Sequence, residues 1–285
     1  MNDYWKTKFA WSNSRQKTWD GCRKRFYLYY IACWERSDLD LKSKIWELKK
    51  LTKMILWKGN LIHGAVCHQI NRAKIGIELG MTSAVKQLEA EVDAAKKHKS
   101  KMFVEIVNGF QIEDQDFDLV LQEAKHQLQN FFELWPRWEG MEIITAEQNE
   151  KFDLMGIPVN IKIDVGFKTF DAMFINVDWK TGKTRPKEAD ESEAVGSYII
   201  GTMNKHSVPV EAVTGELVYL RSGKVFETFR TEEQIGELQA SIIKRSKIML
   251  SAREESDFPA SPGQYQCRDC EFATICPEGK EFIRI

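Results

Sequence analysis

The sequence predicts an α/β fold with a helical insertion, and three observations lead to that class. Apolar residues recur at helical spacing between about 57 and 135, alternate with polar residues from about 142 to 180, and return to helical spacing after 188. The sequence contains no internal repeat, low-complexity segment or Gly/Ser-rich linker. We therefore expect one domain over residues 1–285, with 74–140 as the helical insertion.

The helical segments dominate the first half of the chain. Residues 12–30, "SNSRQKTWDGCRKRFYLYY", mix cations with aromatics and are expected to form a loop that enters a helix, capped by one of the first serines. Residues 57–73, "WKGNLIHGAVCHQINRA", carry apolar side chains on two faces, which predicts a helix buried over much of its girth. Two further helices are expected over 82–98 and 115–135.

Strand-like alternation begins at residue 142. The run "MEIITAEQNEKFDLMGIPVNIKIDVGFKTF" (141–170) alternates in pieces, and its Met155-Gly156 pair predicts a turn. The segment "AMFINVDWK" (172–180) supplies a further apolar strand. These segments predict a mixed sheet.

The last third of the chain returns to helices around one hairpin. A helix is expected over 188–205, and the hairpin joins "GELVYL" to "VFETFR" around Ser222-Gly223. Thr231 and Gln234 have the spacing of a capping box, which predicts the start of the final amphipathic helix. The tail after residue 260 is expected to be loop-like.

Composition excludes several classes of protein. Hydrophobic residues make up 43% and charged residues 29%, as in ordinary globular proteins, and the chain has no run of eighteen apolar residues. The N-terminal stretch lacks the apolar core of a secretory signal, so we expect a cytoplasmic protein without a membrane partner. The net charge of −1 hides a basic segment over residues 1–60, where fourteen Lys and Arg face six Asp and Glu. Such a segment is either a phosphate-facing surface or a solvated helix face.

Two acids and a lysine stand at the ends of neighbouring strand segments. Residues two apart in a strand point the same way, so Asp178 and Lys180 share one side. Asp164 ends the preceding alternating run, and the two carboxylates converge if the strands are neighbours. Carboxylate oxygens suit Mg²⁺, and a lysine beside such a metal can orient water or stabilise charge on a phosphate. The set therefore predicts phosphodiester hydrolysis, whereas each acid taken singly fits a solvated turn.

These residues resemble the PD-(D/E)XK nuclease superfamily. "DWKTG" (178–182) is similar to the last motif of the branch with RecB-type exonuclease domains and CRISPR adaptation nucleases, "KGNLIHGAVCH" (58–68) to its G-x-x-x-H helix, and residues 12–30 to its opening segment. The resemblance spans residues 12–276. It implies a restriction-endonuclease-like core, in which a central mixed sheet is flanked by helices.

The resemblance also implies the roles of individual residues. His63, Asp164, Asp178 and the backbone carbonyl of Trp179 would hold Mg²⁺ or Mn²⁺, with Asp164, Asp178 and Lys180 catalytic. Imidazole favours Mn²⁺. Glu147 stands where relatives carry an acid, either beside the ligands or, as we favour from the sequence, on the surface.

The chain departs from the branch pattern at three positions. Tyr198 matches a branch tyrosine that contacts DNA, but Ala194 replaces the usual glutamine. Arg23 replaces a proline and Ile161 a glycine. None of these changes removes a metal ligand.

Four of the six cysteines form a pattern of one plus three. Cys267-x2-Cys270-x5-Cys276 alone is three-quarters of a zinc site, and Cys22 is the candidate fourth ligand. The pattern resembles the iron–sulfur members of the branch, which implies a structural [4Fe-4S] cluster that staples residues 12–30 to 260–280. Zinc is the alternative. Cys33 and Cys67 are expected to be small core residues.

A nuclease also needs cations that meet the phosphate backbone. Arg23 and Arg25 alternate with aromatic residues, as in grips on single strands. Lys183 and Arg185 follow the catalytic strand directly. The sequence contains no base-reading element, so we expect DNA, single-stranded or with duplex ends, to be bound with little sequence specificity.

The sequence therefore predicts a metal-dependent DNA nuclease. By the resemblance, it would be an exonuclease that prefers single strands and acts with CRISPR adaptation or recombination and repair proteins. The alternative is a DNA-binding accessory subunit of such a complex with little or no cleavage activity. A zinc or redox protein unrelated to DNA is the third hypothesis.

Overall fold

The computed structural model describes residues 4–35 and 39–284, and the chain divides into two compact units. Unit 1 combines Met1–Trp57, Ala95–Asp114 and Ile243–Ile285, and unit 2 combines Lys58–Ala94 and Gln115–Ile242. Each unit is described by itself.

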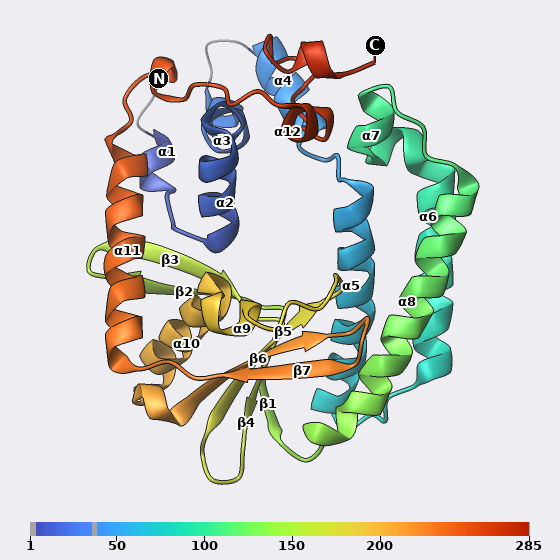
Figure 1. The fold of residues 1–285 in the computed structure, drawn as a ribbon, viewed down its shortest axis with the longest axis vertical. Helices are drawn as coiled ribbons and strands as arrows, with labels where there is room; N and C mark the ends of the chain where they lie inside the picture. Colours follow the sequence, from blue (N-terminus) through green and yellow to red (C-terminus); the bar gives the residue numbers. More distant parts are fainter. Residues whose placement is uncertain (1–3, 36–38, 285) are drawn as a thin grey trace. The chain divides into compact units, whose positions relative to one another are not determined.

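A five-stranded mixed sheet forms the centre of unit 2 (Figure 1). Its strands, in spatial order, are β1 (Glu142–Ala146), β4 (Val165–Lys168), β5 (Phe174–Lys180), β6 (Val213–Tyr219) and β7 (Lys224–Thr228). β5 and β6 are parallel, and the other neighbours are antiparallel. The expected α/β class and mixed sheet are confirmed.

A separate hairpin joins β2 (Asn149–Leu154) to β3 (Ile157–Lys162). Its two-residue turn is the predicted Met155-Gly156, and both residues have positive φ, 51° and 83°. Two-residue turns of this handedness fit the twist of the flanking strands. The Asp153 side chain accepts from the backbone N–H of Gly156 at 2.8 Å, which steadies the turn.

The long helices lie close to where periodicity placed them. Their bounds are α5 Met54–Lys74, α6 Met81–Met102, α8 Asp114–Leu134, α10 Glu193–His206 and α11 Glu232–Ser251. The helix expected over 188–205 is divided into α9 (Glu188–Glu191) and α10, because Ser192 leaves the helical conformation and its hydroxyl caps the N–H of Val195. The predicted capping box of α11 is confirmed, with Thr231 and Gln234 exchanging hydrogen bonds of 3.0 and 3.2 Å.

The two faces of β5 carry different neighbours, as the alternation of a strand requires. Trp179 points to one face, where its ring meets Phe131 of α8 and Trp138 edge-to-face at 5.7 and 5.4 Å. Asn176 and Asp178 point to the opposite face, which α10 covers. On that face Asn176 accepts a hydrogen bond from the hydroxyl of Thr202.

Unit 1 contains short helices and connecting loops. They are α1 (Tyr4–Thr7), α2 (Asn13–Gly21), α3 (Arg23–Tyr30), α4 (Leu39–Leu48), α7 (Val104–Val107) and α12 (Gln264–Arg268), with 3₁₀ turns at Ala32–Trp34, Glu255–Asp257 and Lys280–Phe282. Residues 12–30 form two helices, whereas the sequence predicted a loop and one helix. Ser12 caps α2, and the extended backbone of Cys22 ends α2 and begins α3.

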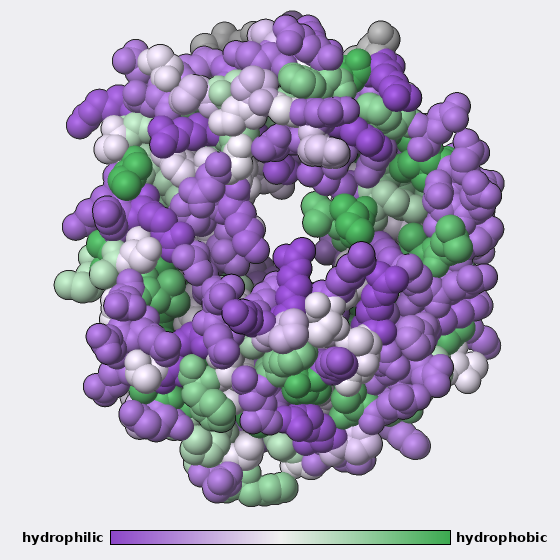
Figure 2. Space-filling view, viewed as in Figure 1, coloured by the Kyte–Doolittle hydropathy of each residue, from purple (hydrophilic) through white to green (hydrophobic). Residues whose placement is uncertain are grey.

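Hydrophilic side chains cover most of the face in Figure 2, and the hydrophobic ones form small separate patches. Among the described residues, no helix combines the length and the apolar character that crossing a membrane requires.

Candidate metal centre and cysteine pocket

Strand register aligns three acids at one edge of the sheet of unit 2. Ala146 of β1 pairs with Val165 of β4, and Val165 pairs with Val177 of β5. Glu147 directly follows β1, Asp164 directly precedes β4, and Asp178 follows Val177 in β5, so all three acids lie next to these pairs. The sequence predicted that Asp164 and Asp178 converge if their strands are neighbours, and β4 and β5 are neighbours.

His63 of α5 completes a compact group with two of these acids. Its Nδ1 lies 3.3 Å from Glu147 Oε1 and 3.4 Å from Asp164 Oδ1. Among the described residues, His63, Glu147 and Asp164 are the group of three whose ligand atoms all lie within 4.8 Å of one another. Asp178 lies outside that limit, whereas Glu147 lies within it.

Glu147 is therefore the residue that sequence reasoning misjudged. It was expected on the surface, but its side chain is only 16% exposed. Its backbone has a positive φ of 52°, and its N–H donates to the carbonyls of Ile163 and Asp164 at 3.0 Å. This local turn directs the carboxylate toward His63 on one side and Lys162 on the other. The available signal was the position of an acid one residue past β1.

The protonation of this group follows from burial and close charge. Burial lowers the pKa of His63, but hydrogen bonds with Asp164 and Glu147 outweigh it and raise the pKa to about 10. Burial raises the pKa of Asp164 to about 6, and the charges of Asp178 and Glu147 contribute in the same direction. Burial raises the pKa of Glu147, but hydrogen bonds from His63 and Lys162 outweigh this effect and lower the pKa to about 2.

Asp164 is held in place by strand β5. Its Oδ2 accepts the backbone N–H of Trp179 at 2.7 Å, which leaves Oδ1 facing His63. Asp164 and Asp178 are 7% and 6% exposed. The role of the Trp179 carbonyl as a ligand stays a prediction.

Lys180 and Tyr198 both turn toward Asp178. Lys180 Nζ lies 2.5 Å from Asp178 Oδ2, and the Tyr198 hydroxyl donates to Asp178 Oδ1 at 3.4 Å. Burial lowers the pKa of Lys180, but the charge of Asp178 outweighs it and the pKa is raised, so the amine is a cation at neutral pH. Burial also raises the pKa of Tyr198, so its hydroxyl keeps its proton.

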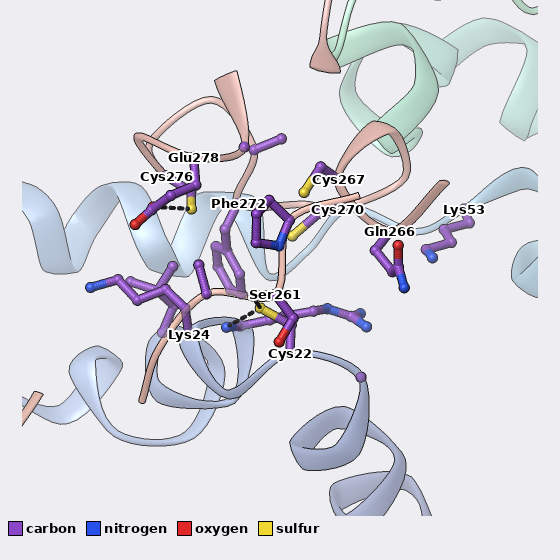
Figure 3. A pocket seen from close by; sticks show the side chains of 17 residues that line it. Cys22, Lys24, Lys53, Ser261, Gln266, Cys267, Cys270, Phe272, Cys276 and Glu278 are labelled. Atoms are coloured by element: carbon purple, nitrogen blue, oxygen red, sulfur yellow. Dashed lines mark hydrogen bonds between the residues drawn. The ribbon is translucent and has the colours of Figure 1, made fainter. Parts of the chain in front are cut away.

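The four cysteines of the one-plus-three pattern line one pocket of unit 1 (Figure 3). Its volume is about 100 Å³. Cys22 comes from the start of α3, Cys267 from α12, and Cys270 and Cys276 from the tail. No three of these sulfur atoms lie within 4.8 Å of one another in the described part of the chain.

Backbone donors and one ion pair frame this pocket. The sulfur of Cys22 accepts from the N–H groups of Arg25 and Ser261, and that of Cys267 from Gly263, each at 3.5 Å. Arg25 also forms a hydrogen-bonded ion pair at 3.0 Å with Glu271, which is buried. Burial raises the pKa of Cys270 to about 12.

The sequence profile of the PD-(D/E)XK nuclease superfamily matches residues 10–277, almost the whole chain. The chain belongs to this superfamily. No curated protein matches it. A solved structure described as "Crystal structure of SSO0001" is similar at 14% identity, over 57% of this chain and 74% of that one, with a TM-score of 0.33.

A divalent cation suits the donor set of this superfamily member. The buried carboxylates of Asp164 and Asp178 repel each other when both are charged. Glu147 and the imidazole of His63 lie beside Asp164. Carboxylate oxygens and imidazole nitrogen are ligands for Mg²⁺ and Mn²⁺. The donor chemistry of the site therefore fits a metal-dependent nuclease.

The cations predicted to meet DNA have different surroundings. Lys183 and Arg185 are exposed on the segment after β5. Arg23 is exposed and lies over the ring of Trp19 at 4.8 Å, whereas Arg25 is committed to Glu271.

Proposed function

We propose that this protein is a Mg²⁺- or Mn²⁺-dependent DNA nuclease. The observation that carries the proposal is the single sheet edge on which three acids, His63 and Lys180 meet. A buried concentration of like charge is costly unless a cation compensates for it, and such sites are typical of metal-dependent hydrolysis.

The residues divide the work of phosphodiester hydrolysis. His63, Asp164 and Asp178 would hold the cation together with the carbonyl of Trp179, and Glu147 would orient His63 or join the ligands. The bound ion would supply Lewis acidity and an activated water. Lys180 keeps a positive charge beside Asp178, where it would stabilise charge that builds on a phosphate oxygen. Asp178 is further oriented by the hydroxyl of Tyr198.

We also propose a structural [4Fe-4S] cluster held by Cys22, Cys267, Cys270 and Cys276. Their common pocket and the N–H donors to two of the sulfurs support it. A tetrahedral zinc site would need sulfurs about 3.8 Å apart, since each Zn–S bond is about 2.3 Å. A cube separates its thiolates more widely because each binds a different iron. Zinc is the alternative, and the metal content of the purified protein distinguishes the two.

The proposed DNA contacts are Lys183, Arg185, Arg23, Arg25 and Tyr198. Exposure supports the first three, while Arg25 and Tyr198 already contact Glu271 and Asp178. Exonuclease action, a preference for single strands and a place in CRISPR adaptation or recombination and repair rest on the resemblance of "DWKTG" and the cysteine pattern to that branch.

The test is a cleavage panel with matched metals and ends. Protein purified without oxygen is incubated with linear single-stranded, linear duplex, end-blocked and circular DNA, in Mn²⁺, Mg²⁺ or EDTA. We expect metal-dependent loss of linear single strands, protection by blocked ends and persistence of circles.

Cleavage of circular DNA would show that the protein is an endonuclease and would overturn the proposed exonuclease activity. Binding without cleavage on every substrate would overturn the enzyme and favour the accessory subunit. A colourless preparation that contains zinc and no iron would overturn the cluster and leave the nuclease standing.

A further inference from the structure

An open cavity lies on unit 2 beside the end of the proposed catalytic strand. Its volume is about 310 Å³, at the lower end of the range of about 300–1,000 Å³ typical of small-ligand sites. Its walls are Gln122, Glu123, His126 and Gln127 of α8 and Arg221, which follows β6. None of these residues belongs to the metal centre.

Hydrogen bonds connect the cavity region to the backbone at the end of β5. β6 runs parallel to β5, and the N–H of Leu220 donates to the carbonyl of Lys180 at 2.9 Å. Asn130 of α8 donates to the carbonyl of Leu220 at 2.7 Å. Arg221 is therefore one residue beyond a direct bond to the catalytic lysine's backbone.

An ion network holds the cations of this region in place. Glu123 contacts both Lys58 of α5 and Arg221, the latter at 3.9 Å. Two cations thus share one acid. Arg221 is about half exposed, and His126 is exposed beside it. A guanidinium in this setting suits a phosphate, which can accept two of its N–H groups.

Gln127 is the second observation that points to a ligand. Its side chain is fully buried, and neither its amide oxygen nor its nitrogen has a hydrogen-bond partner among the residues the structure describes. Buried amides are normally paired. A glutamine amide offers one donor and one acceptor side by side, which matches the edge of a nucleobase such as adenine.

We propose that this cavity is a nucleotide subsite, which binds one nucleotide of the DNA strand. Arg221 and His126 would contact its phosphate, and the amide of Gln127 would pair with the edge of its base. The inference rests on the proposed function, since it takes nucleic acid as the substrate. It adds a site for the strand that the superfamily's metal centre does not supply.

The experiment measures binding of deoxyadenosine monophosphate in EDTA by calorimetry, with inorganic phosphate and deoxyadenosine as partial probes. Wild-type protein is expected to bind one nucleotide per chain, and Arg221→Ala to bind it about tenfold more weakly, since it loses a charge-assisted contact. Gln127→Met keeps the shape of the side chain and removes both polar atoms. It is expected to leave phosphate binding unchanged and to abolish the preference for the nucleotide over phosphate.

The matched controls are Lys151→Ala, an exposed cation on β2, and Gln129→Met, an exposed glutamine of α8. Both should bind as wild type does. Equal nucleotide affinity in wild type and Arg221→Ala, or no binding in wild type, overturns the subsite. Because EDTA removes divalent metal, absence of DNA cleavage would overturn the proposed function without touching this result. Nucleotide binding that depends on Arg221 would then still support the cavity as a nucleotide site.

Discussion

The metal centre and the cysteine pocket bring distant residues together in different ways. In unit 2, the pairing of β1 with β4 and of β4 with β5 brings Glu147, Asp164 and Asp178 to one edge of the sheet. In unit 1, the cysteine ligands come from a helix start, a five-residue helix and a loop, and their sulfurs stay apart. The sheet thus holds its acids close together by itself, whereas the proposed cluster would have to draw the thiols of its pocket together.

The largest expected effect separates the two regions. Lys180→Ala should reduce DNA cleavage by about 10³-fold, because it removes a preorganised charge at the reacting phosphate. Iron content should not change. Single-turnover cleavage and iron analysis on the same preparation measure both, with Lys151→Ala as the control. Cleavage by Lys180→Ala within a few-fold of wild type would remove Lys180 from the mechanism.

The pH dependence of Mn²⁺ binding tests the preorganised site next. A metal ligand must be the neutral imidazole, but the pKa of His63 is raised to about 10, so a proton must leave when the metal binds. Affinity should therefore rise with pH, by about tenfold per unit or about 100-fold from pH 6.5 to 8.5. Calorimetry in buffers of different ionisation enthalpy should show about one proton released.

His63→Gln should bind more weakly and flatten this slope. An affinity that stays constant over the same pH range in wild type would mean that His63 is not a ligand.

A smaller effect is expected at Glu147. Glu147→Gln keeps the shape but weakens the partner of His63, and a change of this kind next to a ligand costs about tenfold in metal affinity. Glu142→Gln, at an exposed position of β1, is the matched control. Equal Mn²⁺ affinity in the two variants would mean that Glu147 takes no part in metal binding.

The counterpart in unit 1 is Cys270→Ser. Iron should fall from about four atoms per chain to fewer than one, because one thiolate of the cube is lost. Mn²⁺ binding by unit 2 should persist. Cys33→Ala, a buried cysteine outside the pocket, should retain its iron. Parallel loss of iron and Mn²⁺ in Cys270→Ser would show that the two regions do not assemble independently.

Local patterns predicted much of the architecture. Period-two alternation placed Asp178 and Lys180 on one side of β5, the Met155-Gly156 pair marked the turn between β2 and β3, and Thr231 marked the start of α11. Each of these features depends on residues a few positions apart. Residues 12–30 were harder because a single cysteine, Cys22, ends one helix and caps the next.

The sequence by itself determined the mixed α/β class, the superfamily and the kinds of side chain available for metal and sulfur chemistry. Only the tertiary structure decided which of them meet. The pairing of β1 with β4 brought Glu147 to His63, and the parallel pairing of β5 with β6 put Arg221 beside Lys180. Local spacing fixes which way a side chain points along its own strand, but the choice of neighbouring strand depends on packing over the whole sheet.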